Sequence, residues 1–168
     1  MDTYGLTILG EIEVENDNTY VMGGVSNRMA NIYSVLFTGT ATSAQWADLA
    51  EKYSCKEEDV PAGTVLSVSE DPEYEVEKCN LDCDPAYAGV VSDNPGFLMG
   101  ERVGGLITGI IGKVPVKIAG AIKKRDFIVP TIDGCARAGV PGEEVYKMGV
   151  SLASNDKKEC KLVLCIIR

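Results

Sequence analysis

The sequence predicts a mainly β protein: a single small β-barrel or sandwich domain with an extended N-terminal β arm and one short helix. Short runs of β-branched and apolar residues recur from Pro61 to the end of the chain, at spacings of about ten to twelve residues. The 18 glycines in 168 residues suit tight turns and bulges between such strands. Aromatic residues make up only 7%, so the core is expected to be mostly aliphatic.

The N-terminal quarter of the chain predicts an extended arm. Residues 6–14, LTILGEIEV, and residues 30–42, ANIYSVLFTGTAT, have strand character, and a turn-rich stretch with a Gly-Gly pair separates them. These strands offer too few apolar positions to close a core, so neighbouring chains would have to supply the missing surface. We therefore predict an arm, shaft or docking segment over residues 1–45 and a β-rich globular domain over residues 46–168.

The segment SAQWADLAEKY, residues 43–53, predicts the short helix. Ser43 can cap it, and Trp46, Leu49 and Tyr53 then fall on one helical face. Such a short helix depends on packing for its stability. Trp46 is the only tryptophan, and it lies where the arm meets the domain. It either locks that junction, within one chain or against a neighbour, or serves as an ordinary core residue.

The remaining segments predict strands, and the last one should be built into the sheet because it runs to the terminal Arg168. The run over residues 104–120 predicts two strands with glycine between them, and Asp133-Gly134 predicts the end of another strand. The segments are GTVLSVS, YEVEKCN, AYAGVVSDNP, GGLITGIIGKVPVKIAG, DFIVPTIDG, EVYKMGVSLAS and CKLVLCIIR.

Composition argues against several classes of function. The net charge of −9 disfavours binding to nucleic acid, because an acidic surface repels phosphate. No apolar run reaches the roughly 18 residues of a membrane span, and the N-terminus does not resemble a signal peptide. The chain has no histidine, which excludes Ser-His-Asp and Cys-His catalysis. No phosphate-binding loop is present, so we predict no catalytic residues and no cofactor.

The cysteines and carboxylates have plain interpretations. The six cysteines suit reduced, partly buried thiols, and the spacing of Cys79 and Cys83 differs from C-x-x-C. Cys160 lies among lysines in NDKKECK, which predicts a solvated hairpin tip. The stretch NLDCDP has oxygen ligands at alternate positions that could bind Ca²⁺, but it lacks the glycine and later glutamate of a helix-loop-helix calcium site. We therefore assign no metal ligands.

Several segments together resemble one family. They are NRMANIYSVLFTGTATSAQWADLAEKY, VPAGTVLSV, AGVVSDNPGFLM, GKVPVKIAGAIKKRDFIVPT and GCARAG, in the same order over residues 27 to about 168. They resemble a domain near the C-termini of tail fibres and other virion appendages of tailed bacteriophages, including cyanophages. Arg125 stands where that family usually has glycine, which leaves the local turn type open. The resemblance also extends, more distantly, to phage autocleaving intramolecular chaperone domains.

This resemblance implies a non-enzymatic structural protein of the phage virion, assembled in the host cytoplasm. The first hypothesis is a homotrimeric tail fibre or appendage domain that contacts baseplate or tail proteins, and a host-surface receptor through loops such as SEDPEYE, SDNPGFLMGERVG and ASNDKKE. The second is a capsid decoration protein bound to the major capsid protein. The third is a self-cleaving chaperone, with Ser43, Asp48 or Glu51 near the scissile bond. The predicted interface residues are Tyr33, Phe37, Trp46, Leu49, Tyr53, Phe97, Leu98 and Met99, of which the last three form an apolar triplet expected to be buried or in a subunit contact.

Overall fold

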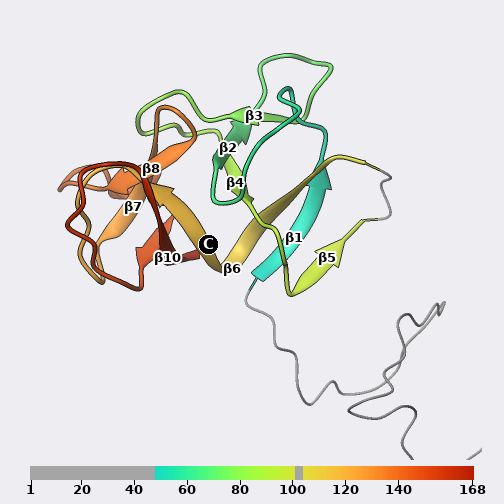
Figure 1. Ribbon diagram of the computed structural model, residues 1–168. Coiled ribbons are helices and arrows are strands. Elements are labelled where there is room, and N and C mark those ends of the chain that lie inside the picture. Colours follow the sequence, from blue (N-terminus) through green and yellow to red (C-terminus); the bar gives the residue numbers. More distant parts are fainter. Residues whose placement is uncertain (1–47, 101–103) are drawn as a thin grey trace, which may run out of the picture. The chain divides into compact units, whose positions relative to one another are not determined.

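The computed structural model describes residues 48–100 and 104–168 (Figure 1). These residues form one ten-stranded sheet and a single 3-10 turn, which confirms the predicted mainly β class. The predicted arm and its boundary at residue 45 lie outside the described residues. The elements are β1 (Asp48–Tyr53), β2 (Val65–Val68), β3 (Val76–Lys78), β4 (Tyr87–Val91), β5 (Phe97–Met99), β6 (Leu106–Ile118), β7 (Phe127–Thr131), β8 (Cys135–Ala138), η1 (Glu144–Tyr146), β9 (Gly149–Ser151) and β10 (Lys161–Ile167).

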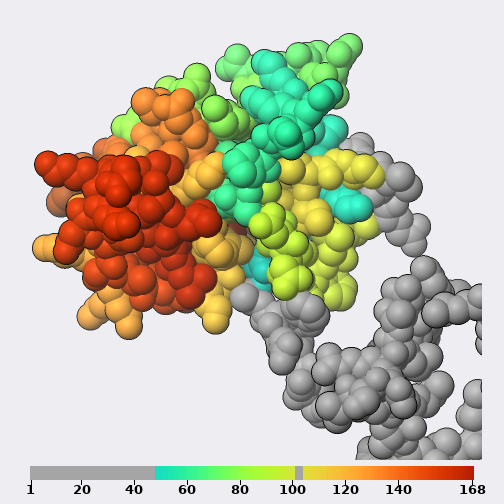
Figure 2. Space-filling view, in the orientation of Figure 1, coloured from blue at the N-terminus to red at the C-terminus, as the bar shows by residue number. Residues whose placement is uncertain are grey.

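Five of the strands close into a small barrel. Neighbouring strands follow the order β10, β9, β7, β8 and β6, and β10 then pairs back with β6. The other strands extend the sheet: β4, β2 and β3 continue from one edge of β6, and β1 followed by β5 from the other. Figure 2 shows the orange and red barrel segments gathered at one end and the cyan and green segments at the other. Closure removes the open edges that a flat sheet would leave on the barrel strands.

The long strand β6 belongs to both parts of the sheet. Its first half pairs antiparallel with β1, and its second half pairs antiparallel with β10. The prediction of two strands separated by glycine is wrong here. Gly112 has a φ of 120°, which L side chains rarely adopt, so the strand changes direction at this residue and continues.

Pro115 lies in the middle of β6, where proline usually interrupts a ladder. The amide of Lys117 donates to the carbonyl of Gly63 at 2.8 Å, away from β10. Since backbone groups two residues apart on a strand face the same edge, the nitrogen of Pro115 also faces away from β10. The missing N–H therefore costs the β6–β10 ladder no hydrogen bond.

The barrel core is aliphatic, as the composition predicts. Val114, Val116 and Ile118 of β6 point inward and are almost completely buried. Val163, Cys165 and Ile167 of β10 alternate in the same way, and each apolar side chain of this size contributes about 1.5–3 kcal/mol when buried. A second, smaller cluster of Leu66, Val76 and Val91 lies under the extension of the sheet.

The predicted helix over residues 43–53 is wrong for its described part, because Asp48–Tyr53 is strand β1. The segment pairs with β6 along one edge and with β5 along the other. An isolated helix of this length has little stability. As a strand paired on both edges, the segment satisfies its backbone hydrogen-bonding groups on both sides. Asp48 and Ala50 are buried, so the inward face alternates with period two rather than following a helical stripe.

Two turns show how local sequence ends the strands. Asp133 and Gly134 have φ of 59° and 64°, and the amide of Cys135 donates to the carbonyl of Ile132, which is the type I′ turn that Asp-Gly favours. This confirms the predicted end of β7. Arg125 has a φ of 80°, and the amide of Asp126 donates to the carbonyl of Lys123. Arg125 thus occupies the left-handed position of a type II turn, where glycine is usual.

Within the described ranges, no helix is long and apolar enough to cross a bilayer.

Candidate interaction surface

The structure places the predicted interface residues on two adjacent strands. Tyr33, Phe37 and Trp46 lie outside the described residues. Leu49 and Tyr53 belong to β1, and the triplet Phe97–Met99 forms β5. The two strands pair in parallel, with Leu49 opposite Phe97 and Ala50 opposite Leu98. Their role in an interface stays a prediction, but the fold brings both groups together.

Strand β5 lies at an edge and is open to solvent in the single chain. Phe97 is 64% exposed and Leu98 is 39% exposed, so burial within the chain, one of the two expectations for this triplet, is wrong. Among the described strands β5 pairs only with β1. An exposed apolar edge strand is a site at which further strands or chains can add.

An apolar face extends from β5 across the sheet. Leu49 is directly opposite Phe97 on one side and Ile111 on the other, so these three side chains form a row on the outer surface. Ile166 faces Lys113, two residues further along β6, which makes it a diagonal neighbour of Ile111. We define the apolar face as Leu49, Phe97, Ile111, Leu162, Leu164 and Ile166.

Strand β10 is apolar on both of its sides. Its inward residues fill the barrel, while Leu162, Leu164 and Ile166 are 54%, 39% and 43% exposed. A strand with one solvated side normally alternates apolar and polar residues. Contiguous apolar surface on a single chain is a mark of an interaction site. The pattern therefore makes the outer side of β10 a candidate interaction surface.

A cavity of about 300 Å³ opens beside this face, and Leu164 also contributes to its wall. Asp48, at the start of β1, lines it and is only 8% exposed. Among residues 48–100 and 104–168, its Oδ2 has no hydrogen-bond partner. A buried carboxylate oxygen without a donor is costly, so the cavity suits a donor group supplied from outside the domain. The lining residues are Asp48, Ala62, Gly63, Val91, Ser92, Asp93, Asn94, Lys113, Val114, Pro115 and Leu164.

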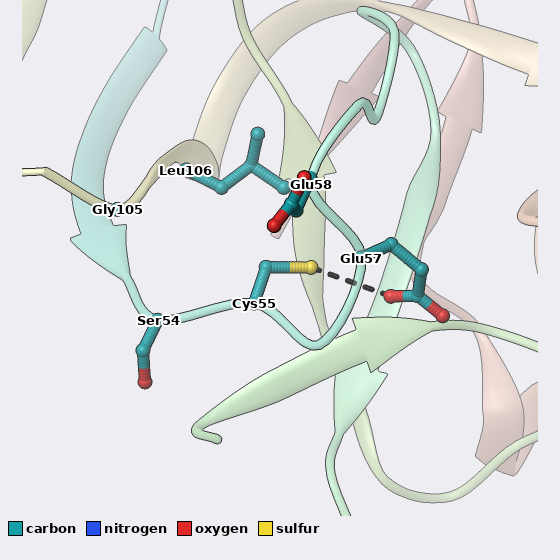
Figure 3. A pocket seen from close by; sticks show the side chains of 6 residues that line it. All are labelled: Ser54, Cys55, Glu57, Glu58, Gly105 and Leu106. Atoms are coloured by element: carbon teal, nitrogen blue, oxygen red, sulfur yellow. Dashed lines mark hydrogen bonds between the residues drawn. The ribbon is translucent and has the colours of Figure 1, made fainter. Parts of the chain in front are cut away.

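A second cavity, of about 380 Å³, lies at the end of β1 and is shown in Figure 3. The thiol of Cys55 donates to the carboxylate of Glu57 at 3.4 Å, and Glu58 and Leu106 also line the space. Burial raises the pKa of Cys55, and the carboxylate of Glu57 adds to the rise. The sulfur is therefore a protonated thiol at neutral pH, which is the wrong state for a nucleophile.

An arginine side chain binds the acidic stretch NLDCDP, the segment whose oxygen ligands could bind Ca²⁺. Arg137, on β8, donates two hydrogen bonds of 2.7 Å to Asp82 and two of 2.8 Å to Glu143. Asp84 accepts instead from the amide of Ala86 at 2.8 Å. Asp82, Cys83 and Glu143 come close enough to surround a cation, but the guanidinium already fills that role. Arg137 thereby fastens the loop before β4 and the loop before η1 to the barrel.

This arginine cluster predicts a loss of stability in acid. The hydrogen bonds of Arg137, followed by the amide of Val140, lower the pKa of Glu143 from 4.5 to about 2, and Arg137 also lowers the pKa of Asp82. Because both folded-state pKa values are depressed, the stabilisation is complete above the unfolded values and disappears as the pH falls from about 4.5 towards 2. We expect Arg137→Gln to flatten the dependence of unfolding free energy on pH in this window, as measured by urea denaturation.

Lys56→Gln is the matched control for this acid experiment. It removes one charge from a more exposed pair with Glu77, which contributes little to stability. An identical acid dependence in the Arg137 and Lys56 variants would contradict the assignment.

Two of the three residues suggested for self-cleavage, Asp48 and Glu51, lie on β1. Ser43 lies outside the described residues. Asp48 is buried, whereas Glu51 accepts a hydrogen bond from the hydroxyl of Tyr53 at 3.0 Å. Burial and the neighbouring Glu51 raise the pKa of Tyr53, so this hydroxyl stays protonated at neutral pH.

Sequence reasoning missed Ile111 and the outer side of β10. The signal was present in KLVLCII, where apolar residues occupy consecutive positions at the end of the chain. A strand without polar alternation predicts apolar surface on both sides, of which only one can face the core of a barrel wall.

Comparison with known proteins gives a likeness of fold. No family model matches the chain, and no curated protein matches it. The structure is similar to the pre-mature gene product 12 of bacteriophage phi29, with a TM-score of 0.55, 12% identity, and coverage of 74% of this chain and 22% of that one. The chain thus spans about a fifth of that protein. Similarity to the N base of head fiber gp8.5 of phi29 has a TM-score of 0.44 at 17% identity, covering 71% of this chain and 92% of that one. The distant resemblance to phage appendage proteins is confirmed at the level of the fold.

Proposed function

We propose that this chain is a non-enzymatic structural component of a phage virion, and that it assembles as a homotrimer through its apolar face. The observation that carries the proposal is the outer side of β10, which is apolar at alternate positions and exposed in the single chain. The shared fold with a segment of a phage protein supports the virion setting. Closed threefold symmetry is a common arrangement for identical chains.

The cavity with Asp48 supports the same proposal. An interface that covers Leu164 also reaches the cavity mouth, and a neighbouring chain can bring a hydrogen-bond donor to the carboxylate. The edge of β5 provides a further contact, with Phe97 as a large apolar anchor. We propose that the assembled face attaches to other virion proteins, at the tail or baseplate, and that exposed loops contact the host surface.

The test is the mass of the intact chain in solution, measured by light scattering after size-exclusion chromatography. We expect the wild type at three times 18.0 kDa, and Ile111→Lys/Leu164→Lys at the mass of one chain, because each substitution places a charge in a dry interface. Both side chains are partly exposed in the single chain, so the fold should be retained.

The control carries the same two charges elsewhere. Val68→Lys/Val145→Lys changes side chains that are 57% and 84% exposed and lie outside the apolar face. A monomeric wild type, or equal behaviour of the two double variants, would overturn the proposed assembly. In the same samples each individual polypeptide should stay intact at 18.0 kDa. Cleavage of the polypeptide into two fragments would contradict the non-enzymatic assignment.

A further inference from the structure

Two of the six cysteines meet at the end of the barrel. The sulfurs of Cys135 and Cys160 are 3.0 Å apart, although the residues are separated by 25 positions in the sequence. Cys135 is the first residue of β8 and is 6% exposed, while Cys160 is exposed and directly precedes β10. A disulfide needs a sulfur separation of about 2.05 Å, so a small approach suffices to join them.

The strand register brings both cysteines to the same end of β6. Ile118, at the end of β6, pairs with Ala136 of β8 on one edge and with Lys161 of β10 on the other. Each cysteine is the residue just before one of these partners. The two cysteines therefore lie at the same end of β6, where β8 and β10 have no ladder of their own, and their sulfurs are in contact there.

The remaining thiols have other partners. Cys55 donates to Glu57, Cys79 to the carbonyl of Leu81, and Cys165 to the carbonyl of Val163. Cys83 accepts a hydrogen bond from Arg137. All six cysteines lie in the described residues, and only this pair has the sulfur-to-sulfur contact.

We propose that Cys135 and Cys160 form a disulfide that fastens β10 to β8 across the end of β6, with a small-molecule disulfide such as oxidised glutathione as the oxidant. The thiolate of Cys160 attacks one sulfur of the oxidant, giving a mixed disulfide and one released thiolate. The thiolate of Cys135 then attacks the sulfur of Cys160 and releases the second small thiol. The protein loses two protons and two electrons, and the oxidant is reduced to two thiols.

Exposure determines this order of attack. Cys160 can be reached from solvent, whereas Cys135 is buried and cannot meet the oxidant directly. Burial, followed by the neighbouring Cys160, raises the pKa of Cys135 to about 12; Asp133 adds to the rise and Lys117 opposes it. Only a small fraction of Cys135 is therefore in the thiolate form that the second step requires. The short distance between the two sulfurs compensates for this small fraction.

The experiment treats the full chain with oxidised glutathione, alkylates the remaining thiols under denaturing conditions, and maps the peptides by mass spectrometry. We expect two fewer alkylated cysteines and one cross-linked peptide pair containing Cys135 and Cys160. The midpoint of thermal unfolding should rise by several degrees and return when a reductant is added, because the bridge restricts the unfolded chain.

Single substitutions make the outcome decisive. Cys135→Ser should stop at the mixed disulfide on Cys160, Cys160→Ser should gain no bridge, and Cys83→Ser should form the bridge as the wild type does. A wild type that accumulates the same mixed disulfide as Cys135→Ser would overturn the proposal, as would a bridge between other cysteines. If a variant fails to fold, the wild-type peptide map alone decides.

Discussion

Gly149→Ala is expected to lower the free energy of unfolding by about 3 kcal/mol, at the upper end of the range for overpacking. Gly149 lies on β9 between β7 and β10 and pairs with residues of both. A Cβ added there would come within 2.2 Å of the carbonyl oxygen of Ile166 and 3.1 Å of the Cα of Ile167. Both are backbone atoms of the strand that closes the barrel, so relief requires the β9–β10 pairing to open.

Urea denaturation of the wild type and the variant measures this effect. Gly120→Ala is the control, since Gly120 has a φ of 78° but no atom within 4 Å of an added Cβ. It should cost about 1 kcal/mol through backbone strain alone. Equal losses of stability in the two variants would show that the short distance from position 149 to the backbone of β10 is not the reason that glycine is required there.

Ile118→Ala is expected to cost about 2–5 kcal/mol, because the deletion leaves a cavity in a packed core. Ile118 is 0% exposed and lies among the aliphatic residues that fill the barrel. It is also the residue of β6 that pairs with both β8 and β10. The surrounding strands are held in place by closure of the barrel and have little freedom to collapse into the space.

The same substitution at a surface isoleucine provides the comparison. Ile132 is 53% exposed in the turn after β7, and Ile132→Ala should change the unfolding free energy by no more than about 0.5 kcal/mol. Equilibrium denaturation of both variants gives the difference. A loss below about 1 kcal/mol for Ile118→Ala would show that the end of the barrel repacks freely.

Local sequence was sufficient for much of the fold. The β class, most strand positions and the Asp133-Gly134 turn follow from periodicity and turn chemistry, which act over a few residues. Closure of the barrel does not follow from them, because the β10–β6 pairing joins segments about 49 residues apart on average. The segment DLAEKY was assigned to a helix because its composition suits either state, and pairing on both edges decides for a strand.

The candidate surface was predictable only in part. The triplet Phe97–Met99 is conspicuous as an apolar run in a turn-rich stretch, which predicts burial or a subunit contact. Ile111 and Leu164 could not be assigned to the same face without the register, since a shift of one residue moves every side chain of a strand to the other side. The meeting of Cys135 with Cys160 likewise depends on the partners of Ile118 on its two edges.

The register around Gly112 also determines how the domain bears load. Asp48, at the start of β1, and Ile167, at the end of β10, both pair with this one residue. From Gly112 the two strands run in opposite directions along β6, so their ends meet at this residue. Tension applied between these two ends falls first on the backbone hydrogen bonds beside Gly112. Under such a pull the ladders of β1 and β10 open one hydrogen bond at a time from Gly112 outward, so the domain yields by peeling rather than by sliding.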